Sequence, residues 1–381
     1  MAGPDPVDPC LEALRNELDG VDVDLIDLAA RRQQIVAEIG RIKQGAGRQL
    51  RDFRREREVI DRVRTRAGQT GLNPDVAEDL LKRLIDASLT RQEQDRVRAA
   101  GRGEGRSALV IGGAGLLGGW LVAFLDSQGY AVSVADPVVD TRLQRSYRDW
   151  RAAPLDAGLI VVSTPPRASA AILSELAARQ VPGLVFDVGS IKSPLIPALR
   201  AAAASGLKVC SVHPMFGPDT QLLSGRHVLL MDVGCRAALE EAGQLFVDTM
   251  AEVVEVGLDE HDRLMALVLG LSHALNIAFF TALVRSGIEA GQLAGISSTT
   301  FKRQLEIARD VAAENPELYH EIQRLNEHGG LARRALVEAV DLLSAASDAD
   351  HPDAFIDLMS EGRRYLEGLG RASSLNPETS R

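Results

Sequence analysis

The stretch Val110-Ile-Gly-Gly-Ala-Gly-Leu-Leu-Gly118 decides the fold of the middle of this 381-residue chain. An apolar run from Ala108 to Ile111 leads into Gly113-x-Gly115-x-x-Gly118, a helix-like segment follows, and a second apolar run ends before Asp136. This order of strand, glycine turn, helix, strand and acid is typical of a dinucleotide-binding unit, because the turn and the helix N-terminus present N–H groups to a pyrophosphate. The acid can bind a ribose 2′-hydroxyl and therefore favours NAD over NADP.

The glycine triplet alone would also fit a turn in an unrelated α/β fold. Its strand context and Asp136 favour cofactor binding, whereas Arg142 or Arg145 leaves some tolerance of NADP open. A further apolar run ends in Val162-Ser-Thr-Pro-Pro166, at the edge of the sheet where ligands collect in open α/β folds. The predicted NAD-binding residues are Gly113, Gly115, Leu116, Leu117, Gly118, Asp136, Ser163, Thr164 and Pro165.

Composition places the chain among ordinary soluble globular proteins, with 45% hydrophobic and 25% charged residues. A net charge of −10 argues against general nucleic-acid binding. The three cysteines are too scattered for a disulfide framework, and we expect no metal site. The N-terminus lacks the basic flank of a signal peptide, and no uninterrupted apolar run is long enough to cross a membrane. We therefore expect a cytoplasmic protein with no membrane partner.

Three regions that differ in the pattern of their apolar residues predict a multidomain protein. We expect an all-α domain, an α/β Rossmann-type domain and a second all-α domain. The α/β prediction rests on apolar runs at 108–112, 131–135, 158–163, 183–188, 207–212 and 227–232. The expected boundaries are 8–98 for the first helical domain, 99–106 for a glycine-rich linker, 107–257 for the Rossmann-like domain, 258–371 for the second helical domain and 372–381 for a solvated tail.

The first helical domain is expected to contain one long helix, 9–43, and two shorter ones, 53–68 and 74–97. A helix of that length spans about 50 Å, more than a 90-residue domain can cover, so pairing with a second chain is expected. Arg32 interrupts its apolar seam, and an unpaired guanidinium there is costly unless an anion meets it. Lys43 lies three turns further along the same side. A cationic pocket for a small dicarboxylate is therefore predicted, with solvated surface charge as the alternative.

These residues resemble the all-helical chorismate mutases over about residues 8–97. The resemblance rests on Leu14-Arg15-x-x-Leu18-Asp19, Arg31-Arg32, Glu38-Ile39-Gly40, Lys43 and Asp52-x-x-Arg55-Glu56. It implies a domain-swapped homodimer in which the N-terminal helices are shared between chains. The implied roles are a partner-supplied Arg15, carboxylate binding by Arg32 and Arg55, contact of Lys43 and Gln92 with the ether oxygen, and binding of the ring hydroxyl region by Asp52, Glu56 and Ser88. A Claisen rearrangement suits such a pocket, because it needs a folded conformer and charge stabilisation rather than a nucleophile.

Two further motifs end predicted strands in the Rossmann-like region. Asp187-Val-Gly-Ser190-Ile-Lys192 follows one strand, and Val212-His213-Pro-Met-Phe-Gly-Pro218 follows another. A lone histidine is more often structural, but its place at a strand tip in a cofactor-binding domain favours catalysis here. Histidine suits the removal of a hydroxyl proton near neutral pH, and Ser190 would hydrogen-bond the same oxygen.

These motifs resemble those of prephenate dehydrogenases from about residue 107 to 370. Together with the mutase-like arm, the chain is similar to the bifunctional chorismate mutase/prephenate dehydrogenases of tyrosine biosynthesis. The resemblance implies oxidative decarboxylation of prephenate to 4-hydroxyphenylpyruvate, a C-terminal helical dimerisation domain and a possible tyrosine inhibitor. It also places His261 and His273 near the substrate or inhibitor. The family's carboxylate-binding arginine falls on Asp310, which leaves Arg309 or Arg303 as the candidate.

Two alternatives stay open at this point. A monofunctional prephenate or arogenate dehydrogenase would use the helical arm only for dimerisation or regulation. An arginine-rich helix that binds nucleic acid is the other, although the acidic net charge and the seam position of Arg32 argue against it.

Overall fold

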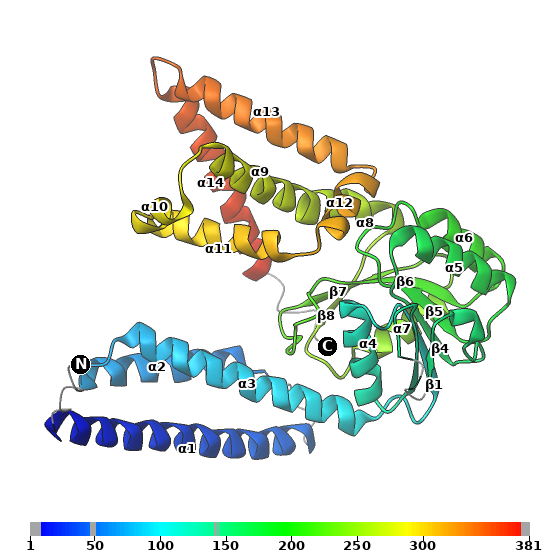
Figure 1. The fold of residues 1–381 in the computed structure, drawn as a ribbon, viewed down its shortest axis with the longest axis horizontal. Coiled ribbons are helices and arrows are strands. Elements are labelled where there is room, and N and C mark those ends of the chain that lie inside the picture. Colours follow the sequence, from blue (N-terminus) through cyan, green and yellow to red (C-terminus); the bar gives the residue numbers. More distant parts are fainter. Residues whose placement is uncertain (1–8, 46–50, 141, 143–144, 375–381) are drawn as a thin grey trace, which may run out of the picture. The chain divides into compact units, whose positions relative to one another are not determined.

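A computed structural model describes residues 9–45, 51–140, 142 and 145–374 of the protein. The chain forms two compact units (Figure 1). The first unit contains the N-terminal helices and the sheet and ends at Val256. The second unit begins at Gly257 and also takes in two short earlier segments, 165–170 and 190–197. Residues 1–8, on which the expectation of no signal peptide partly rests, lie outside the described residues.

The three N-terminal helices are α1 (Pro9–Gly45), α2 (Phe53–Thr70) and α3 (Pro74–Ala100). Asp52 caps the start of α2, Pro74 occupies the first turn of α3, and Gly71 and Gly101 end α2 and α3 in the left-handed region. Both α1 and α2 pack against α3. The three predicted helices are thus confirmed. The predicted linker was wrong at its start, because α3 continues to Ala100 before the cap ends it.

The first unit is built on an eight-stranded sheet of order β3-β2-β1-β4-β5-β6-β7-β8. All neighbouring strands are parallel except β6 and β7. The strands are β1 (Ser107–Ile111), β2 (Ala131–Ala135), β3 (Ser146–Tyr147), β4 (Leu159–Val162), β5 (Leu184–Asp187), β6 (Val209–Pro214), β7 (His227–Met231) and β8 (Glu252–Glu255). The six predicted strands are therefore confirmed to within two residues, and the prediction missed β3 and β8.

Helices cover the sheet and complete its core. They are α4 (Leu116–Ser127), α5 (Pro166–Ala178), α6 (Ile196–Ala204) and α7 (Arg236–Gln244), with a 3₁₀ turn at Trp150–Ala152. The central strands are continuous apolar runs because both of their faces are buried. Aromatic rings extend this core at one side, where Trp120 stacks on Phe124 and Phe124 on Phe246. The order of the strands brings the carboxyl ends of β1, β4, β5 and β6 to one edge, where the predicted site residues lie.

The second unit is helical. α8 (Leu258–Met265), a π-helical turn (Ala266–Leu271) and α9 (Ser272–Arg285) run without a break. They are followed by α10 (Ala290–Gly295), α11 (Thr299–Ala313), α12 (Pro316–Leu325), α13 (Gly329–Ser347) and α14 (Asp353–Ser374). Helix α14 continues to Ser374, into the predicted solvated tail, and 375–381 lie outside the described residues.

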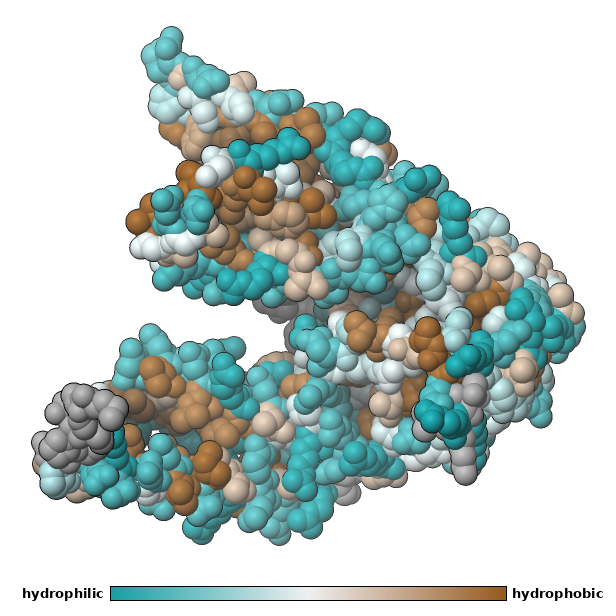
Figure 2. Space-filling model, viewed as in Figure 1, coloured by the Kyte–Doolittle hydropathy of each residue, from teal (hydrophilic) through white to brown (hydrophobic). Residues whose placement is uncertain are grey.

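Much apolar surface stays exposed on the helices of this single chain (Figure 2). On α1, Leu14, Leu18 and Leu28 are each more than half exposed. The continuous helix Leu258–Arg285 is long and apolar enough, by length and composition, to cross a membrane. Only 11% of its most apolar stretch is buried within this chain. Polar residues such as Ser272, His273 and Asn276 interrupt the apolar residues of this helix, so it contains no long uninterrupted apolar run. One such helix is weak grounds for a membrane span.

Candidate active sites

A cavity of about 290 Å³ opens among the three N-terminal helices. Cationic, acidic and amide side chains share this cavity with an apolar floor. Its lining residues are Arg32, Val36, Ile39, Lys43, Asp52, Arg55, Glu56, Val59, Ile85, Ser88, Leu89 and Gln92. Every predicted mutase residue except Arg15 is therefore brought to one place. Arg15 lies on the exposed surface of α1 and does not line the cavity within this chain.

Arg32 is held at the cavity wall by α3. Its Nη1 donates to the carbonyl oxygen of Leu84 at 3.0 Å and to Ser88 Oγ at 3.1 Å. Ser88 Oγ lies in turn 2.8 Å from Oε1 of Gln33, a residue that the sequence did not suggest. Burial lowers the pKa of Arg32, but a guanidinium starts so high that it keeps its charge at neutral pH. The site thus presents a fixed cation.

Gln92 is fixed by a close approach of α1 to α3. Its Nε2 donates to the carbonyl oxygen of Val36 at 2.7 Å. Gly40 permits this approach, because a Cβ there would lie 2.8 Å from Gln92 Nε2 and 3.0 Å from its Cδ. The glycine in the quoted mutase motif therefore has a steric role that only the packed helices reveal.

The acidic residues of the cavity are both engaged at the start of α2. Asp52 accepts a hydrogen bond from the Arg55 backbone N–H at 2.9 Å and so caps the helix. Glu56 pairs with Arg51, whose Nη2 lies 3.0 Å from Oε2. The Arg55 side chain pairs with the exposed Glu58 at 3.2 Å, and hydrogen bonds from arginines lower the pKa of Glu58. Because that pair is solvated, it holds Arg55 only weakly.

The glycine turn of the Rossmann-like fold has the geometry that a bound dinucleotide requires. Gly112 has a φ of +86°, and a Cβ there would lie 2.1 Å from the Ser163 carbonyl oxygen. A Cβ at Gly118 would lie 2.1 Å from the Gly112 carbonyl oxygen. Gly115 caps α4 without a side-chain hydrogen bond, so backbone N–H groups at the helix start suit a pyrophosphate. The turn therefore fits NAD.

Asp136 lies where the ribose acid was predicted, directly after β2. Its carboxylate accepts from the Ala114 N–H at 3.3 Å and from the Val138 N–H at 3.1 Å. These contacts tie the acid to the glycine turn. Val162-Ser-Thr-Pro-Pro166 likewise follows β4, and the Ser163 N–H donates to the Ile111 carbonyl oxygen at 2.8 Å.

His213 lies near the end of β6 and is 3% exposed. Its strand is joined to β5 by the buried Asp187, whose Oδ1 accepts from Ser211 Oγ at 2.6 Å. The other oxygen of Asp187 accepts from the Gly189 N–H at 3.0 Å and shapes the turn before Ser190. Asp187 therefore contacts Ser211, two residues before His213, and Gly189, directly before Ser190. The sequence had not suggested a role for Asp187.

In the second unit, Asp262 holds the segment that follows Ser190. Its carboxylate accepts from the Lys192 N–H at 2.8 Å and from both the N–H and the hydroxyl of Ser193. His261 Nδ1 lies 2.7 Å from the same carboxylate. Burial alone would raise the pKa of Asp262, but these hydrogen bonds outweigh it and lower the pKa to about 2. His261 is fully buried, and this contact supports a positioning role for it. Its predicted contact with substrate stays a prediction.

The remaining predicted residues of the second unit are spread over two helices. Arg303 and Arg309 both lie exposed on α11 and do not share a face, since six residues turn a helix by about 240°. His273 on α9 stacks on Tyr319 of α12 with ring centroids 4.2 Å apart, and burial lowers its pKa. Its Nδ1 is buried without a hydrogen-bond partner among the described residues.

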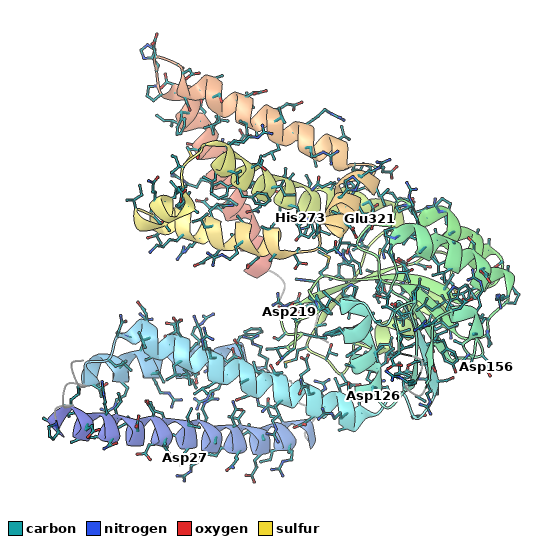
Figure 3. The ribbon with its side chains drawn as sticks, viewed as in Figure 1. Asp27, Asp126, Asp156, Asp219, His273 and Glu321 are labelled. Carbon is teal, nitrogen blue, oxygen red and sulfur yellow. The ribbon has the colours of Figure 1, made fainter. Side chains whose placement is uncertain are left out.

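A polar cavity of about 370 Å³ was not predicted from the sequence. It is lined by Arg167, His320, Glu321, Arg324 and Leu325. Glu321 and His273 are marked in Figure 3, on α12 and α9 respectively. Nothing in the sequence suggested that Arg167, which follows the β4 turn, meets α12. Within the described residues, no group of three or more His, Cys, Asp or Glu side chains is placed to hold a metal ion.

Comparison with known proteins covers all three regions. Residues 14–93 match the family model of chorismate mutase type II, 138–255 that of the prephenate dehydrogenase nucleotide-binding domain, and 258–361 that of the prephenate dehydrogenase dimerization domain. The T-protein of Enterobacter agglomerans is 30% identical over 319 residues, which are 82% of this chain and 81% of that protein. The chain belongs to the T-protein family. It is a bifunctional enzyme of tyrosine biosynthesis, with isomerase and NAD-dependent oxidoreductase activities.

A second family member, the T-protein of Haemophilus influenzae, is 26% identical and covers 82% of this chain and 80% of its own. Among solved structures, prephenate dehydrogenase from A. aeolicus with hydroxyphenyl propionate and NAD+ aligns with a TM-score of 0.56, at 17% identity, over 69% of this chain and 98% of that one. Synechocystis arogenate dehydrogenase aligns with a TM-score of 0.50, also at 17% identity, over 68% of this chain and 99% of that one. These structures share the fold. The nucleotide-binding match begins at residue 138, so the glycine turn is assigned from its own geometry.

Proposed function

We propose that chorismate binds in the cavity among the N-terminal helices, with Arg32 and Arg55 on its carboxylates. The observation that carries this proposal is the convergence of Arg32, Lys43, Arg55 and Gln92 on one cavity of suitable size. Asp52, Glu56 and Ser88 would meet the ring hydroxyl and its surroundings. Fixed guanidinium groups recognise carboxylates in a bidentate way, which selects one orientation of the substrate.

Catalysis in this cavity would come from conformer selection and charge stabilisation. Arg32 and Gln92 are already held by Leu84, Ser88 and Val36 before substrate arrives. One N–H of the Gln92 amide goes to Val36, and the second is available in this proposal to the ether oxygen, opposite Lys43. Negative charge that develops on this oxygen in the transition state is then met by preorganised donors.

A second copy of the chain would complete each mutase site. Most large apolar side chains of α1, such as Leu14, Leu18 and Ile26, are more than half exposed although the helix packs against α3. We assign this face to the α1 of a partner in a domain-swapped dimer, which would bring the partner's Arg15 to the cavity. The C-terminal helices, which match a dimerization domain, would form a further part of the same homodimer.

In the dehydrogenase half, His213 would accept the proton of the C4 hydroxyl of prephenate while Ser190 hydrogen-bonds the same oxygen. NAD, when bound at the glycine turn, accepts the hydride that leaves C4. Loss of the ring carboxylate as carbon dioxide leaves its bonding electrons to aromatise the ring, and the oxygen regains a proton. Asp136 would bind the adenosine ribose. Leu116, Leu117, Ser163, Thr164 and Pro165 would line the cofactor's path.

Arg309 or Arg303 would bind the side-chain carboxylate of prephenate, with His261 and His273 near that end. Prephenate is preferred to arogenate in this proposal, tyrosine acts as a feedback inhibitor, and the enzyme works in the cytoplasm. We place the mutase domain at 8–98, the NAD-binding domain at 107–257 and the dimerisation domain at 258–371.

Two variants test the assignment of the two sites. Arg32→Ala should lower mutase kcat/KM at least about 100-fold, because a fixed cation at the cavity wall is lost. His213→Asn should lower the dehydrogenase rate by about 10²- to 10⁴-fold, the usual contribution of a positioned general base. Loss of chorismate absorbance and formation of NADH from added prephenate measure the two rates separately. Each variant is the control for the other, and loss of both activities in either one would contradict the assignment.

A further inference from the structure

The segment of the dehydrogenase domain that follows His213 contacts a residue directly behind the mutase cavity. Arg51, at the start of α2, makes the contact. Its Nη1 donates to Ser224 Oγ at 2.7 Å, and Ser224 lies in the connection between β6 and β7. Both residues belong to the first unit. A residue next to the mutase site therefore makes a contact outside the helical domain.

The opposite side of the Arg51 guanidinium holds Glu56. Nε lies 3.1 Å from Oε1, and Nη2 lies 3.0 Å from Oε2, so both carboxylate oxygens are engaged. The guanidinium also lies 4.6 Å from the centre of the Phe53 ring. Arg51 and Glu56 are only 24% and 19% exposed in their side chains, so this pair is better ordered than a surface pair. Glu56 lines the cavity, whereas Arg51 stands behind it.

The same connection is fixed a second time, on α3. Glu93 is buried and accepts a hydrogen bond from the Leu223 N–H at 2.8 Å and another from the Met250 N–H. It directly follows Gln92, a cavity residue. Trp120 holds the far end of the connection by donating to the Thr220 carbonyl oxygen at 2.8 Å. Ser224 is therefore presented to Arg51 by a stretch of backbone that two side chains, Glu93 and Trp120, restrain.

We propose that Arg51 is a positioning residue of the mutase, which acts through Glu56 and is itself set by Ser224 of the dehydrogenase domain. Arg51 orients the Glu56 carboxylate toward the substrate without touching the substrate. Ser224 selects the guanidinium rotamer that makes this possible. This inference rests on the proposed role of Glu56 in the cavity.

The test is a set of full-length variants assayed for mutase kinetics. Arg51→Ala should lower mutase kcat/KM about 10- to 100-fold, mainly through KM, because an acid that binds the substrate loses its orientation. Arg51→Lys should fall between wild type and Arg51→Ala, since the charge remains and the fork is lost. Ser224→Ala should lower kcat/KM a few-fold. Arg54→Ala, which removes an exposed arginine from the first turn of α2, is the matched control and should leave the mutase unchanged.

A double-mutant cycle distinguishes positioning from a merely structural effect. In a Glu56→Gln background, Arg51→Ala should lower mutase kcat/KM little further, because Arg51 acts on the Glu56 carboxylate and that carboxylate is absent. Dehydrogenase activity with added prephenate should persist in all variants and shows that they are folded. Additive losses in the cycle, or wild-type mutase kinetics in Ser224→Ala, would overturn the inference. If Glu56→Gln itself left the mutase unchanged, the proposed role of Glu56 would fail instead.

Discussion

Asp262 shows how one buried carboxylate organises the neighbouring segment that follows Ser190. It receives the N–H groups of Lys192 and Ser193, the Ser193 hydroxyl and the His261 ring. Asn326 also donates to its backbone carbonyl oxygen at 2.8 Å. The segment after Ser190 is thus tied to α8 and to the end of α12. Lys192 and Ser193 are thus held by a residue 70 and 69 positions further along the chain, a contact that no local pattern predicts.

The lowered pKa of Asp262 predicts a defined pH dependence of stability. With a folded pKa of about 2 against an ordinary value of 3.8, the carboxylate contributes about 2 kcal/mol. This contribution is complete above the unfolded value and is lost as pH falls from about 4 through about 2. Asp262→Asn should therefore lower the thermal midpoint at pH 7, and the difference from wild type should shrink toward pH 2.

Glu260→Gln on the same helix serves as the control, because its exposed pair with Arg263 is worth little. A difference between wild type and Asp262→Asn that stayed constant from pH 7 to pH 2 would show that the charge of Asp262 is not what stabilises the segment.

At the scale of elements, the contact of α1 with α3 depends on Gly40. Gly40→Ala places a methyl group against the Gln92 amide, which must leave the Val36 carbonyl oxygen. Because the displaced group is the end of a flexible side chain, we expect little loss of stability, and alanine gains about 0.5–1 kcal/mol of helix propensity. Mutase kcat/KM should fall about 10-fold. Thermal unfolding and mutase kinetics measure the two effects.

Gly68→Ala on α2 is the matched control, because a Cβ there meets nothing within 4 Å. It should keep full mutase activity. An active Gly40→Ala enzyme would show that the Gln92 amide needs no fixed position.

The elements that the sequence revealed carry a continuous or periodic apolar pattern. The apolar runs of β1 and β4 follow from burial in the sheet, whereas the periodic apolar residues of α1 are largely exposed in this single chain. The two missed strands lie at the edges of the sheet. β3 has only two residues, and the four residues of β8 are all exposed, so neither leaves an apolar signal.

The same distinction holds for the candidate sites. Arg32 and Lys43 were predicted because their spacing puts them on one side of a single helix. The roles of Arg51, Gly40 and Asp187 depend on which elements pack together, and local spacing in the sequence does not predict that packing. For His261, the buried pair with Asp262 comes from a contact inside the helical unit, and its predicted contact with substrate stays a prediction.

At the scale of the whole molecule, the mutase site should be shared between two chains. If Arg15 of one chain serves the cavity that holds Arg32 of the other, a mixed dimer of Arg15→Ala and Arg32→Ala chains has one intact site. Each parent homodimer has none. The purified mixed dimer, from chains with different tags, should therefore show about half of the wild-type mutase rate.

A mixed dimer as inactive as its parents would show that both arginines act within the same chain. Dehydrogenase activity of the same preparation provides the control for its folding.

The connection between α3 and β1 has a consequence for how the two enzymes can be separated. The Gly103 and Gly105 N–H groups donate to the carbonyl oxygens of Gln128 and Gly129, and Arg102 pairs with Asp248. Such a connection offers no loose tether for a protease. The compact units of this chain therefore do not coincide with its two activities. A cut near residue 100 divides the first unit, whereas that unit ends at Val256. A gene that lost its mutase by truncation would need new surface residues on the dehydrogenase before it could fold as well.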